Sequence, residues 1–523
     1  MATTDHIDHD TKRLHELGYA QELDRKMGTF SNFAISFSII SVLAGAITTY
    51  WLGMYAGGPL VITTSWVIVG VFALAVGASM AEICSTYPTA GGLYYWSAKL
   101  AKKNGPQAAW WTGWFNMIGQ IGVIASVDFA LANFVLLSIN LFGDAASSLI
   151  EINKWSVFIT YLVVLVIHGL LNTFGVNLVR VLGDVSVWWH VVGVAVIVAA
   201  LLLGSDGGQG FGTTFEFRNG TGWDFPGSGI YVFLVGLLLA QYTITGFDAS
   251  AHVSEETVGA ATGAPKAIVR AIYISAIAAL IMNCVMNAVT PAAMYDEIAA
   301  KGILAGPAVF TAALTGTMGK LLVIIATVGQ FFCGMASVTA NSRMIYAFSR
   351  DNGLPGSSIW SKVNRTTRTP TNSVWLGVVL SAFVGTLSLI QTDLAYPVAF
   401  FALTGICVVG LYISYIIPVF LKVRNPDFKQ GPWNLGKWSK PIGWVAVAWV
   451  ALVSIVFVLP VFYPWKTWET FNFTGPVLLL SALFVGTWWA SSARKWFTGP
   501  KVQGTPEELA AIEHELSQIN TPH

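Results

Sequence analysis

Twelve apolar runs divide this chain of 523 residues, and each has about the 20 residues that an α-helix needs to cross a bilayer. Charged residues make up 11% of the chain, against roughly 25% in soluble domains, and the mean hydropathy is +0.63. Helices satisfy their own backbone hydrogen bonds in lipid, so the pattern predicts an all-α polytopic membrane protein with 12 transmembrane helices. The predicted spans are 30–54, 61–83, 107–140, 155–174, 182–204, 229–254, 268–290, 317–348, 372–390, 395–421, 441–461 and 473–492.

The basic residues give these spans an orientation. With the N-terminus placed inside, 23 of the 28 Lys and Arg residues fall in inner segments and five fall in outer segments. This asymmetry agrees with the positive-inside rule, and a miscounted span would remove it. The third and eighth spans are long and are expected to tilt or protrude. Both termini are therefore predicted to be cytoplasmic, and the outer basic residues are Lys154, Arg218, Lys301, Lys320 and Lys466.

The loops and termini contain no soluble domain. The N-terminal segment is polar and lacks the short apolar core of a cleaved signal peptide. The longest outer loop is rich in Gly, Thr and Asp and is expected to cover the outer mouth, whereas Thr505-Pro506-Glu507-Glu508 predicts a short exposed helix in the tail. In order, the segments are 1–29, 30–204 with the first five spans, 205–228 as the outer loop, 229–421 with the next five spans, 441–492 with the last two, and the cytoplasmic tail 493–523.

Composition and motifs exclude several functions. The net charge of +1 provides no basic domain for a nucleic-acid partner. The four cysteines are scattered in or beside apolar runs without a CxxC pair, which indicates buried thiols rather than disulfides or metal ligands. Gly91-Gly92 lacks the Lys-Ser/Thr of a phosphate loop, and HExxH and nucleophile-elbow motifs are absent from the sequence, so ATP-driven transport and intramembrane catalysis are not expected. No cofactor is expected.

Two spans contain residues that loosen a helix at membrane depth. The sixth span has Thr245 and Gly246, and the first span has Ser41 and Ala44-Gly45-Ala46 at the matching place, five spans earlier. Small residues in one span can simply allow close helix packing. Corresponding interruptions in two halves favour an inverted-repeat transporter with its binding site at the midplane. Spans three and eight repeat a fainter pattern, in which Gly119-Gln120 and Gly329-Gln330 are each followed by Ala-Ser-Val.

Several separated motifs resemble the amino acid–polyamine–organocation superfamily over nearly the whole chain. The start of the chain and Trp188–His190 are similar to its amino acid/choline branch, which includes fungal GABA and choline permeases and bacterial amino acid permeases. The resemblance implies a LeuT-type fold with two five-helix inverted repeats, broken helices 1 and 6, and alternating access. The motifs are Glu82–Gly92 with Tyr94-Tyr95-Trp96, Thr245–Asp248 with Glu255-Glu256 and Pro265–Ile268, Ser342–Pro355, and Gly18–Met27.

The resemblance also implies how a small zwitterion is held. Its carboxylate would meet backbone N–H groups at the first break, and its ammonium would meet carbonyls at the second, which agrees with the partial charges at helix ends. The family's usual Gly-x-Gly is replaced here by Ala44-Gly45-Ala46, which narrows the pocket. Asp248 either contacts the ammonium or caps the second half of the sixth span. The candidate substrate residues are Ser41, Val42, Ala44, Gly45, Ala46, Tyr242, Thr243, Ile244, Thr245, Gly246 and Asp248.

Ionisable residues in the spans are candidates for coupling and gating. His190 resembles, by position, a lysine of proton-coupled relatives that fills the place of a sodium ion in sodium-coupled ones, so it is the predicted proton-coupling residue and sodium is not expected. The alternative is a neutral, hydrogen-bonded histidine. His252 is one turn from Asp248 and can pair with it. Further candidates are Asp128 and His168, as proton relays or satisfied hydrogen-bond partners, and Glu82, Glu255 and Glu256, as an inner gate or solvated groups.

These observations predict a secondary transporter of the plasma membrane that imports GABA, β-alanine or a related amino acid by proton symport. The alternatives are a choline or polyamine carrier, an amino acid exchanger of the same fold, and a nutrient receptor. Tyr242 and Trp51 are aromatic residues that could pack on a substrate or surround a quaternary ammonium. The expected partners are the zwitterionic substrate and the lipid bilayer, and the sequence leaves monomer and homodimer open.

Overall fold

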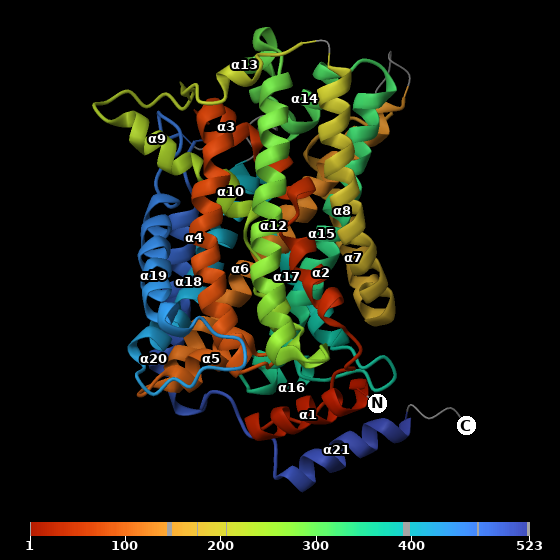
Figure 1. Cartoon of the computed structure of the whole chain (residues 1–523), viewed down its shortest axis with the longest axis vertical. Helices are drawn as coiled ribbons and strands as arrows, with labels where there is room; N and C mark the ends of the chain where they lie inside the picture. Colours follow the sequence, from red (N-terminus) through yellow and green to blue (C-terminus); the bar gives the residue numbers. More distant parts are fainter. Residues whose placement is uncertain are drawn as a thin grey trace.

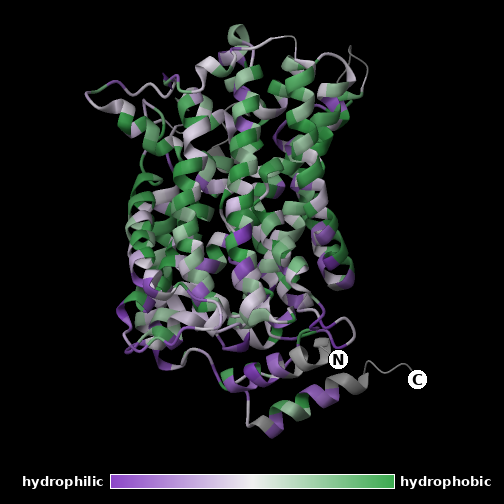
Figure 2. Cartoon of the chain, viewed as in Figure 1, coloured by the Kyte–Doolittle hydropathy of each residue, from purple (hydrophilic) through white to green (hydrophobic). Residues whose placement is uncertain are grey.

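The lateral faces of this helical bundle are apolar, as expected of a protein surrounded by lipid. The computed structural model describes residues 2–143, 149–174, 176–205, 207–390, 398–467 and 470–519. Figure 2 shows hydrophobic residues along the length of the bundle and hydrophilic residues gathered at its lower end. Large apolar side chains such as Leu203, Phe383 and Leu480 are exposed on the helix faces. A soluble protein would not expose so much apolar surface.

Eleven helices within the described residues are long and apolar enough to cross a membrane by length and composition. They correspond to eleven of the twelve predicted spans. The predicted span 229–254 is the exception because its longest apolar helical stretch is Ser228–Thr243. The main helices are α2 (Thr29–Ile39), α4 (Gly58–Thr86), α6 (Gly105–Leu141), α7 (Lys154–Phe174), α8 (Val176–Gly204), α12 (Ala260–Val289), α15 (Thr317–Arg350), α17 (Thr371–Gly385), α18 (Val398–Arg424), α19 (Ser439–Val456) and α20 (Thr474–Ser491).

The first predicted span is interrupted at its centre. Helix α2 ends at Ile39, Ser41 has an extended backbone, and a short π-helix, η1 (Val42–Ala46), precedes α3 (Tyr50–Tyr55). In the sixth predicted span, α9 (Ser228–Gly236) and α10 (Leu238–Thr243) precede α11 (Ala249–His252) and the 3-10 turn η3 (Ser254–Glu256). Both predicted breaks are therefore present.

Glycine is required at the second break. Gly246 has φ +94°, and a Cβ atom there would lie 2.3 Å from Ile39 Cγ2. Only glycine adopts such a backbone conformation readily and leaves room for this contact. Because Ile39 is the last residue of α2, the contact brings the two breaks directly against each other.

The two longest helices form the centre of the bundle. Helix α6 has 37 residues and α15 has 34, so the predicted length of the third and eighth spans is confirmed. Helix α6 packs against both α15 and α18, and α15 also packs against η1. Side chains of α6, α15 and α18 are thereby placed around the breaks.

Several ends differ from the predicted boundaries. Helix α12 begins at Ala260, where the sequence indicated a turn, and it contains Pro265. Proline removes the N–H that would bond the carbonyl four residues earlier. That carbonyl, on Ala261, accepts a hydrogen bond from Ser85 Oγ at 2.7 Å instead, so the helix tolerates the proline. Residues 395–397, the start of the tenth predicted span, lie outside the described residues.

Short helices between the spans were not predicted. Helix α5 (Gly92–Leu100) lies at the lower end of the bundle in Figure 1, and α13 (Tyr295–Ala299) lies at its upper end. Helix α14 (Ala305–Ala313) follows α13, and the four-residue helix α16 (Ser357–Trp360) follows α15. Their length is below that of a membrane span, so a search for apolar runs does not detect them. The remaining 3-10 turns are η2 (Phe211–Thr213), η4 (Ala292–Met294), η5 (Gly302–Leu304), η6 (Thr386–Ile390), η7 (Gly436–Trp438) and η8 (Ala493–Lys495).

The loop between α8 and α9 packs over the end of the bundle opposite the termini. Its strand β2 (Arg218–Asn219) pairs antiparallel with β1 (Ala56–Gly57), which directly follows α3. The guanidinium of Arg218 lies 4.3 Å from the centre of the Tyr295 ring in α13. The loop is thus joined to both neighbouring segments, in agreement with its predicted covering role.

The two chain ends meet below the bundle (Figure 1). Helix α1 (Ala2–Leu17) and helix α21 (Pro506–Ile519) are joined by His15 Nε2 and Glu513 Oε1 at 2.8 Å. The predicted start of α21 is confirmed, because the backbone N–H of Thr505 donates to Glu508 Oε2 at 2.8 Å, as in a capping box.

One buried ion pair gives a prediction about stability. Lys422 Nζ lies 2.7 Å from Glu82 Oε2, and both side chains are fully buried. Replacing Lys422 by Met leaves a buried carboxylate without its cation, which costs about 3–5 kcal/mol. We expect a lower apparent melting temperature for Lys422→Met in detergent.

Lys102→Met is the matched control. Lys102 pairs with Asp427 at 2.8 Å, but the two side chains are 55% and 78% exposed. Exposed pairs contribute less than about 1 kcal/mol. Equal melting temperatures for the two variants would contradict the assigned role of Lys422.

Candidate functional site

The backbone freed at the first break is satisfied by side chains. The carbonyl oxygen of Ile39 accepts a hydrogen bond from Cys333 Sγ at 3.3 Å. Ser41 Oγ accepts from the backbone N–H of Ala44 at 3.0 Å and so caps the π-helix. Because the bilayer interior supplies no water to a lipid-exposed backbone, such partners are needed wherever a helix opens.

The second break is held by two tyrosines of α18. Tyr412 donates from its hydroxyl to the Ile244 carbonyl at 2.7 Å. The Tyr415 hydroxyl accepts from the Gly246 N–H at 3.2 Å and donates to Asp248 Oδ1 at 2.6 Å. Sequence reasoning missed both tyrosines. The available signal was two hydroxyls three residues apart in an apolar helix, which places them on one face.

A small buried cavity of about 20 Å³ lies between the two breaks. This volume holds about one water molecule, so the site is contracted in this conformation. The cavity is lined by backbone and side chains from both breaks and from the central helices. Its lining residues are Ile39, Ala44, Gly45, Thr48, Val123, Val127, Ala130, Tyr242, Thr243, Thr245, Gln330, Cys333 and Cys407.

The structure brings most of the predicted substrate residues to this region. Five line the cavity itself, namely Ala44, Gly45, Tyr242, Thr243 and Thr245. A second cavity of about 10 Å³ is lined by Gly246 and Asp248 together with Gln120 and Ser337. Ser41 contacts His190 instead. The remaining predicted residues, Val42, Ala46 and Ile244, are absent from the lining of either cavity.

The glutamines of the repeated Gly-Gln pattern lie at these cavities. Gln330 lines the larger one, is fully buried, and has no hydrogen-bond partner for either amide atom within the described residues. Gln120 lines the smaller one and donates to Asn116 Oδ1 at 3.0 Å. An unpartnered buried amide is costly, so Gln330 is available to a polar group entering the cavity.

His190 contacts the first break. Its Nε2 lies 2.6 Å from Ser41 Oγ, and its Nδ1 lies 2.8 Å from the Ser186 carbonyl oxygen. A carbonyl oxygen only accepts, so Nδ1 carries a hydrogen. In the neutral ring Nε2 is then an acceptor, and the Ser41 hydroxyl donates to it. His190 is buried and satisfied in its neutral form.

Asp248 was a candidate helix cap, and this part of the prediction is wrong. Asp248 is the residue before α11, but its side chain accepts no hydrogen bond from the helix backbone. The carboxylate turns to other side chains, because Asn116 Nδ2 lies 3.0 Å and His252 Nε2 lies 3.2 Å from Oδ2. The predicted pairing of Asp248 with His252 is confirmed.

Asp128 and His168 also pair with each other. His168 Nδ1 lies 3.1 Å from Asp128 Oδ2, and both side chains are fully buried. A Cβ atom on Gly334 of α15 would lie 2.0 Å from Asp128 Oδ1, so this glycine leaves the space that the carboxylate occupies. The pair joins α6 to α7 and lies outside the lining of the cavities.

Ion pairs connect the ends of the helices on the side of the bundle that carries the termini. Glu256 forms two contacts with Arg343, at 2.8 and 3.1 Å, and Glu255 forms two with Arg350, at 3.1 and 3.2 Å. With the Glu82–Lys422 pair, all three predicted inner carboxylates have basic partners. Because Glu255 and Glu256 follow α11 whereas the arginines belong to α15, these pairs hold the second half of the sixth predicted span against α15.

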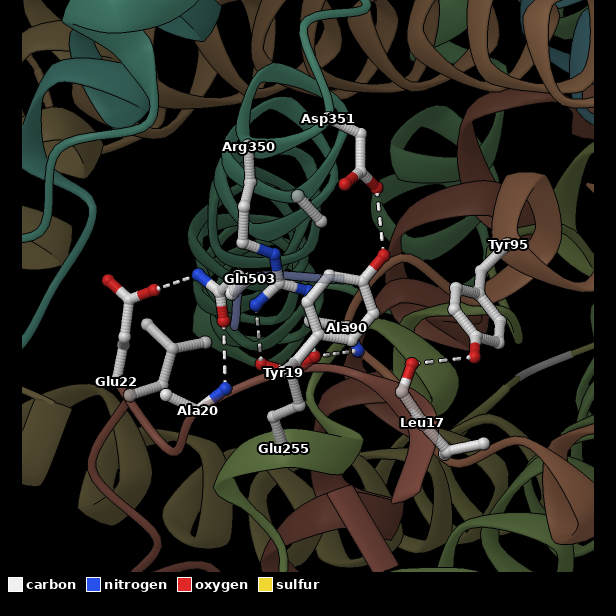
Figure 3. A network of polar contacts seen from close by, with 12 residues as sticks. Leu17, Tyr19, Ala20, Glu22, Ala90, Tyr95, Glu255, Arg350, Asp351 and Gln503 are labelled. Atoms are coloured by element: carbon white, nitrogen blue, oxygen red, sulfur yellow. Dashed lines mark hydrogen bonds and ion pairs between the residues drawn. The ribbon is translucent and has the colours of Figure 1, made fainter. Parts of the chain in front are cut away.

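The N-terminal segment packs against the Glu255–Arg350 pair (Figure 3). The Tyr19 ring lies 3.8 Å from the Arg350 guanidinium carbon, and its hydroxyl donates to Asp351 Oδ2 at 2.9 Å. Burial raises the pKa of the Asp351 carboxyl, while Arg350 beside it acts in the opposite direction. Gln503 of the C-terminal segment in turn accepts from the Ala20 N–H at 2.7 Å. The N- and C-terminal segments thus cover the same end of the bundle.

Trp51 lies away from the cavities, on the other side of the first break. Its ring stacks on Phe462 with a centroid distance of 6.2 Å and an interplanar angle of 8°. Trp51 is absent from the lining of either cavity, so only Tyr242 of the two predicted aromatic contacts is placed to meet a substrate.

A helical bundle with a buried site between two opposed helix breaks has the architecture of a membrane transporter. The sequence agrees: a family model described as "Amino acid permease" matches residues 27–483. The chain therefore belongs to the amino acid permease family, and it is a multi-pass membrane transporter, not an enzyme. This membership confirms the superfamily and implies a LeuT-like fold.

Relatives match along almost their whole length. Amino-acid permease BAT1 of Arabidopsis thaliana is 43% identical over 511 residues, covering 94% of this chain and 96% of that protein. Its homolog in Oryza sativa subsp. japonica is 40% identical, covering 93% and 95%. Amino-acid permease 2 of Neurospora crassa is 29% identical, covering 94% and 88%.

The close approach of the two breaks gives a prediction for Gly45. A Cβ atom there would lie 2.6 Å from Thr243 Oγ1 and 2.9 Å from Thr243 Cα. Overpacking of this kind costs about 1–3 kcal/mol and would push the two breaks apart. We expect Gly45→Ala to lower amino acid uptake about tenfold or more at equal protein level.

Gly212→Ala is the control for this substitution. Gly212 lies in the outer loop, and a Cβ atom there meets no atom within 4 Å. Uptake by this variant should equal that of the parent protein. Parental uptake by Gly45→Ala would show that the spacing of the breaks does not limit transport.

Proposed function

We propose that this permease imports a small zwitterionic amino acid, such as GABA, β-alanine or a related amino acid, across the plasma membrane by proton symport. The mechanism is alternating access in a LeuT-type arrangement of two five-helix inverted repeats plus two further helices, with both termini cytoplasmic. The observation that carries the proposal is the buried cavity whose walls are the two helix breaks.

The two breaks provide poles of opposite sign. The π-helix η1 begins at Val42 with its N-terminal end at the break, whereas α10 ends at Thr243 with its C-terminal end there. Helix N-termini favour anions and C-termini favour cations. A substrate carboxylate directed to Ala44 and Gly45 and an ammonium directed to Tyr242 and Thr243 would match this arrangement. In the present conformation the N–H groups of Ala44 and Gly45 donate to Ser41, so the carboxylate would have to compete with these bonds. Gln330 is placed to contact the bound substrate between these two poles.

The chemistry of the lining favours an amino acid over a polyamine or choline. The cavity-lining residues include no Asp, Glu, Lys, Arg or His among the described part of the chain. A polyamine requires carboxylates, and a quaternary ammonium is held by several aromatic rings, whereas Tyr242 is the one aromatic residue in this lining. A net-neutral zwitterion fits such a cavity without leaving a buried charge unpaired.

A radiolabelled uptake panel in proteoliposomes tests the substrate. The panel contains GABA, β-alanine, neutral α-amino acids, choline and a polyamine, each measured under imposed pH and sodium gradients. We expect a zwitterionic amino acid to accumulate under an inward proton gradient and to compete with unlabelled analogues. Transport of choline or polyamine alone would overturn the proposal, and sodium dependence without pH dependence would overturn proton coupling.

The proposed coupling residue is His190. Protonation converts its Nε2 from an acceptor into a donor, so the Ser41 hydroxyl can no longer donate to it. Ser41 must then turn its proton elsewhere, and Ser41 also caps the π-helix through Ala44. Proton binding at His190 would therefore act directly on the wall of the substrate site.

His190→Ala separates coupling from binding. We expect this variant to lose pH-driven accumulation because the titrating ring is gone, yet to retain substrate exchange between equal internal and external pools. The measurement is counterflow beside gradient-driven uptake in the same vesicles. Accumulation that still responds to the pH gradient would remove His190 from the mechanism, and full exchange without accumulation would support it.

A further inference from the structure

The three buried histidines of the helical core have partners of different kinds. His190 faces one carbonyl and one hydroxyl, and a hydroxyl can donate. His168 faces one carboxylate through Nδ1, and its Nε2 has no hydrogen-bond partner within the described residues. Each of these two rings is compatible with the neutral form, in which one nitrogen donates and the other accepts.

His252 is different because both of its ring nitrogens face acceptors. Its Nδ1 lies 3.1 Å from the Ala90 carbonyl oxygen, and its Nε2 lies 3.2 Å from Asp248 Oδ2. A carbonyl oxygen and an ionised carboxylate cannot donate. A neutral ring beside an ionised Asp248 would leave one of these contacts without a hydrogen. The two hydrogen bonds therefore require one additional proton, on either the imidazole or the carboxyl group.

We propose that the Asp248–His252 pair binds a proton from the inner aqueous side and that this proton holds α11 against the inner loop at Ala90. The site is distinct from His190, which lies at the first break. It binds a proton reversibly, and the proton returns to inner water when α11 separates from the loop. This inference deepens the proposed transport mechanism but depends on no particular substrate.

The backbone N–H and carbonyl of Ala90 are both bound by the same short segment. Its N–H donates to Glu255 Oε1 at 2.9 Å (Figure 3), and its carbonyl accepts from His252. Glu255 also binds Arg350 of α15. These two hydrogen bonds join α11 and η3 to the loop that contains Ala90 and precedes α5. Of its two contacts, the one through His252 depends on the additional proton.

The surroundings of the pair are otherwise uncharged or neutralised. Helix α6 contributes the amides of Asn116 and Gln120, and α18 contributes the Tyr415 hydroxyl, with Tyr412 and Cys407 farther along the same helix. On α15, Arg343 and Arg350 are each bound to a glutamate, Glu256 and Glu255 respectively. Lys266 and Arg270 of α12 and Lys99 of α5, two further helices that pack against α11, are exposed. From α2, Ser36 and Asn32 bind the backbone around Ser250. Within the described residues, His252 is the one ionisable basic side chain that pairs with Asp248, whose other partners are the Asn116 and Gln120 amides and the Tyr415 hydroxyl.

Loss of the proton has a direct mechanical consequence. A neutral His252 ring has one nitrogen without a hydrogen. If the Asp248 carboxylate is ionised, that nitrogen faces an oxygen of either Ala90 or Asp248, and the two lone pairs repel each other in a buried site. The closed contact is weakened, and opening of α11 toward the inner side is favoured. Raising the inner pH should therefore increase exposure of the loop around Thr89, which is buried in the closed structure.

The test measures this exposure without using transport. Thr89→Cys is introduced after the four native cysteines are replaced, and a membrane-impermeant maleimide is applied to inside-out vesicles between about pH 5 and about pH 9, which spans histidine titration. The rate is divided by that of a cysteine placed at exposed Gly212 in the same background and labelled in right-side-out vesicles, which corrects for thiol ionisation. We expect the corrected rate to rise about tenfold with pH, equivalent to about 1.4 kcal/mol.

Asp248→Asn is the decisive variant. An amide can donate to Nε2 while neutral His252 donates to Ala90, so both hydrogen bonds form without the additional proton. The corrected labelling rate should then be independent of pH. Asp128→Asn is the matched control, because it makes the same change at the other buried Asp–His pair and should keep the parental pH dependence.

Each outcome decides the proposal. Parental pH dependence in Asp248→Asn, or its loss in Asp128→Asn, would refute it. If Asp248→Asn does not reach the membrane, His252→Gln provides the same test, because glutamine does not titrate and should also give a flat profile. His190→Ala should retain the pH dependence of labelling. Failure of the uptake panel would leave this experiment unaffected, so the two proposals can fail separately.

Discussion

The structure depends on supplying hydrogen-bond partners to the backbone N–H and carbonyl groups that are left without helical partners at the two breaks inside the bilayer. Each break exposes carbonyl and N–H groups where water is scarce, and each such group costs several kcal/mol if it remains unpaired. Cys333 and Ser41 supply partners at the first break, and Tyr412 and Tyr415 supply them at the second. These side chains come from α15, from the residue before η1 and from α18, so the packing of α15 and α18 against the breaks supplies the missing partners.

The same partners connect the breaks to titratable groups. Ser41 satisfies the π-helix and contacts His190, whereas Tyr415 satisfies Gly246 and contacts Asp248. A change in the protonation of His190 or Asp248 would therefore alter the hydrogen bonds of the hydroxyl groups that bind the opened backbone. Such a connection needs no long pathway through the protein, because one hydroxyl serves both the backbone and the ionisable side chain.

The sequence predicts the helical class and the location of the breaks well, for clear physical reasons. Long apolar runs indicate the membrane spans, and glycine or other small residues at matching depth indicate the breaks. The side chains that hydrogen-bond the backbone at the breaks are much harder to predict from the sequence. Tyr412, Tyr415 and Cys333 are ordinary residues of apolar helices, and their role appears only when α15 and α18 pack against the breaks.

The role of Asp248 shows the same limit in another form. Its position before α11 suggests a helix cap, because the local sequence shows its neighbours along the chain but not the side chains that pack against it from other helices. Its actual partners, Asn116 and Tyr415, are separated from it by 132 and 167 positions. The repeated Gly-Gln pattern indicated only a relation between spans three and eight, and the structure adds that Gln330 and Gln120 line the larger and the smaller cavity.

The proposed mechanism separates the charges of the substrate from the charge of the coupling proton. The cavity between the breaks is lined by uncharged side chains, whereas Asp248 lines the neighbouring cavity beside His252, and His190 contacts Ser41 at the first break. A zwitterion adds no net charge to this cavity, so its binding does not require a compensating ionised side chain. Protons can then bind and leave without competing for the substrate's contacts. If His190 acts on the first break and His252 on the loop before α5, as proposed, one conformational change can respond to both protons while the lining of the larger cavity stays uncharged.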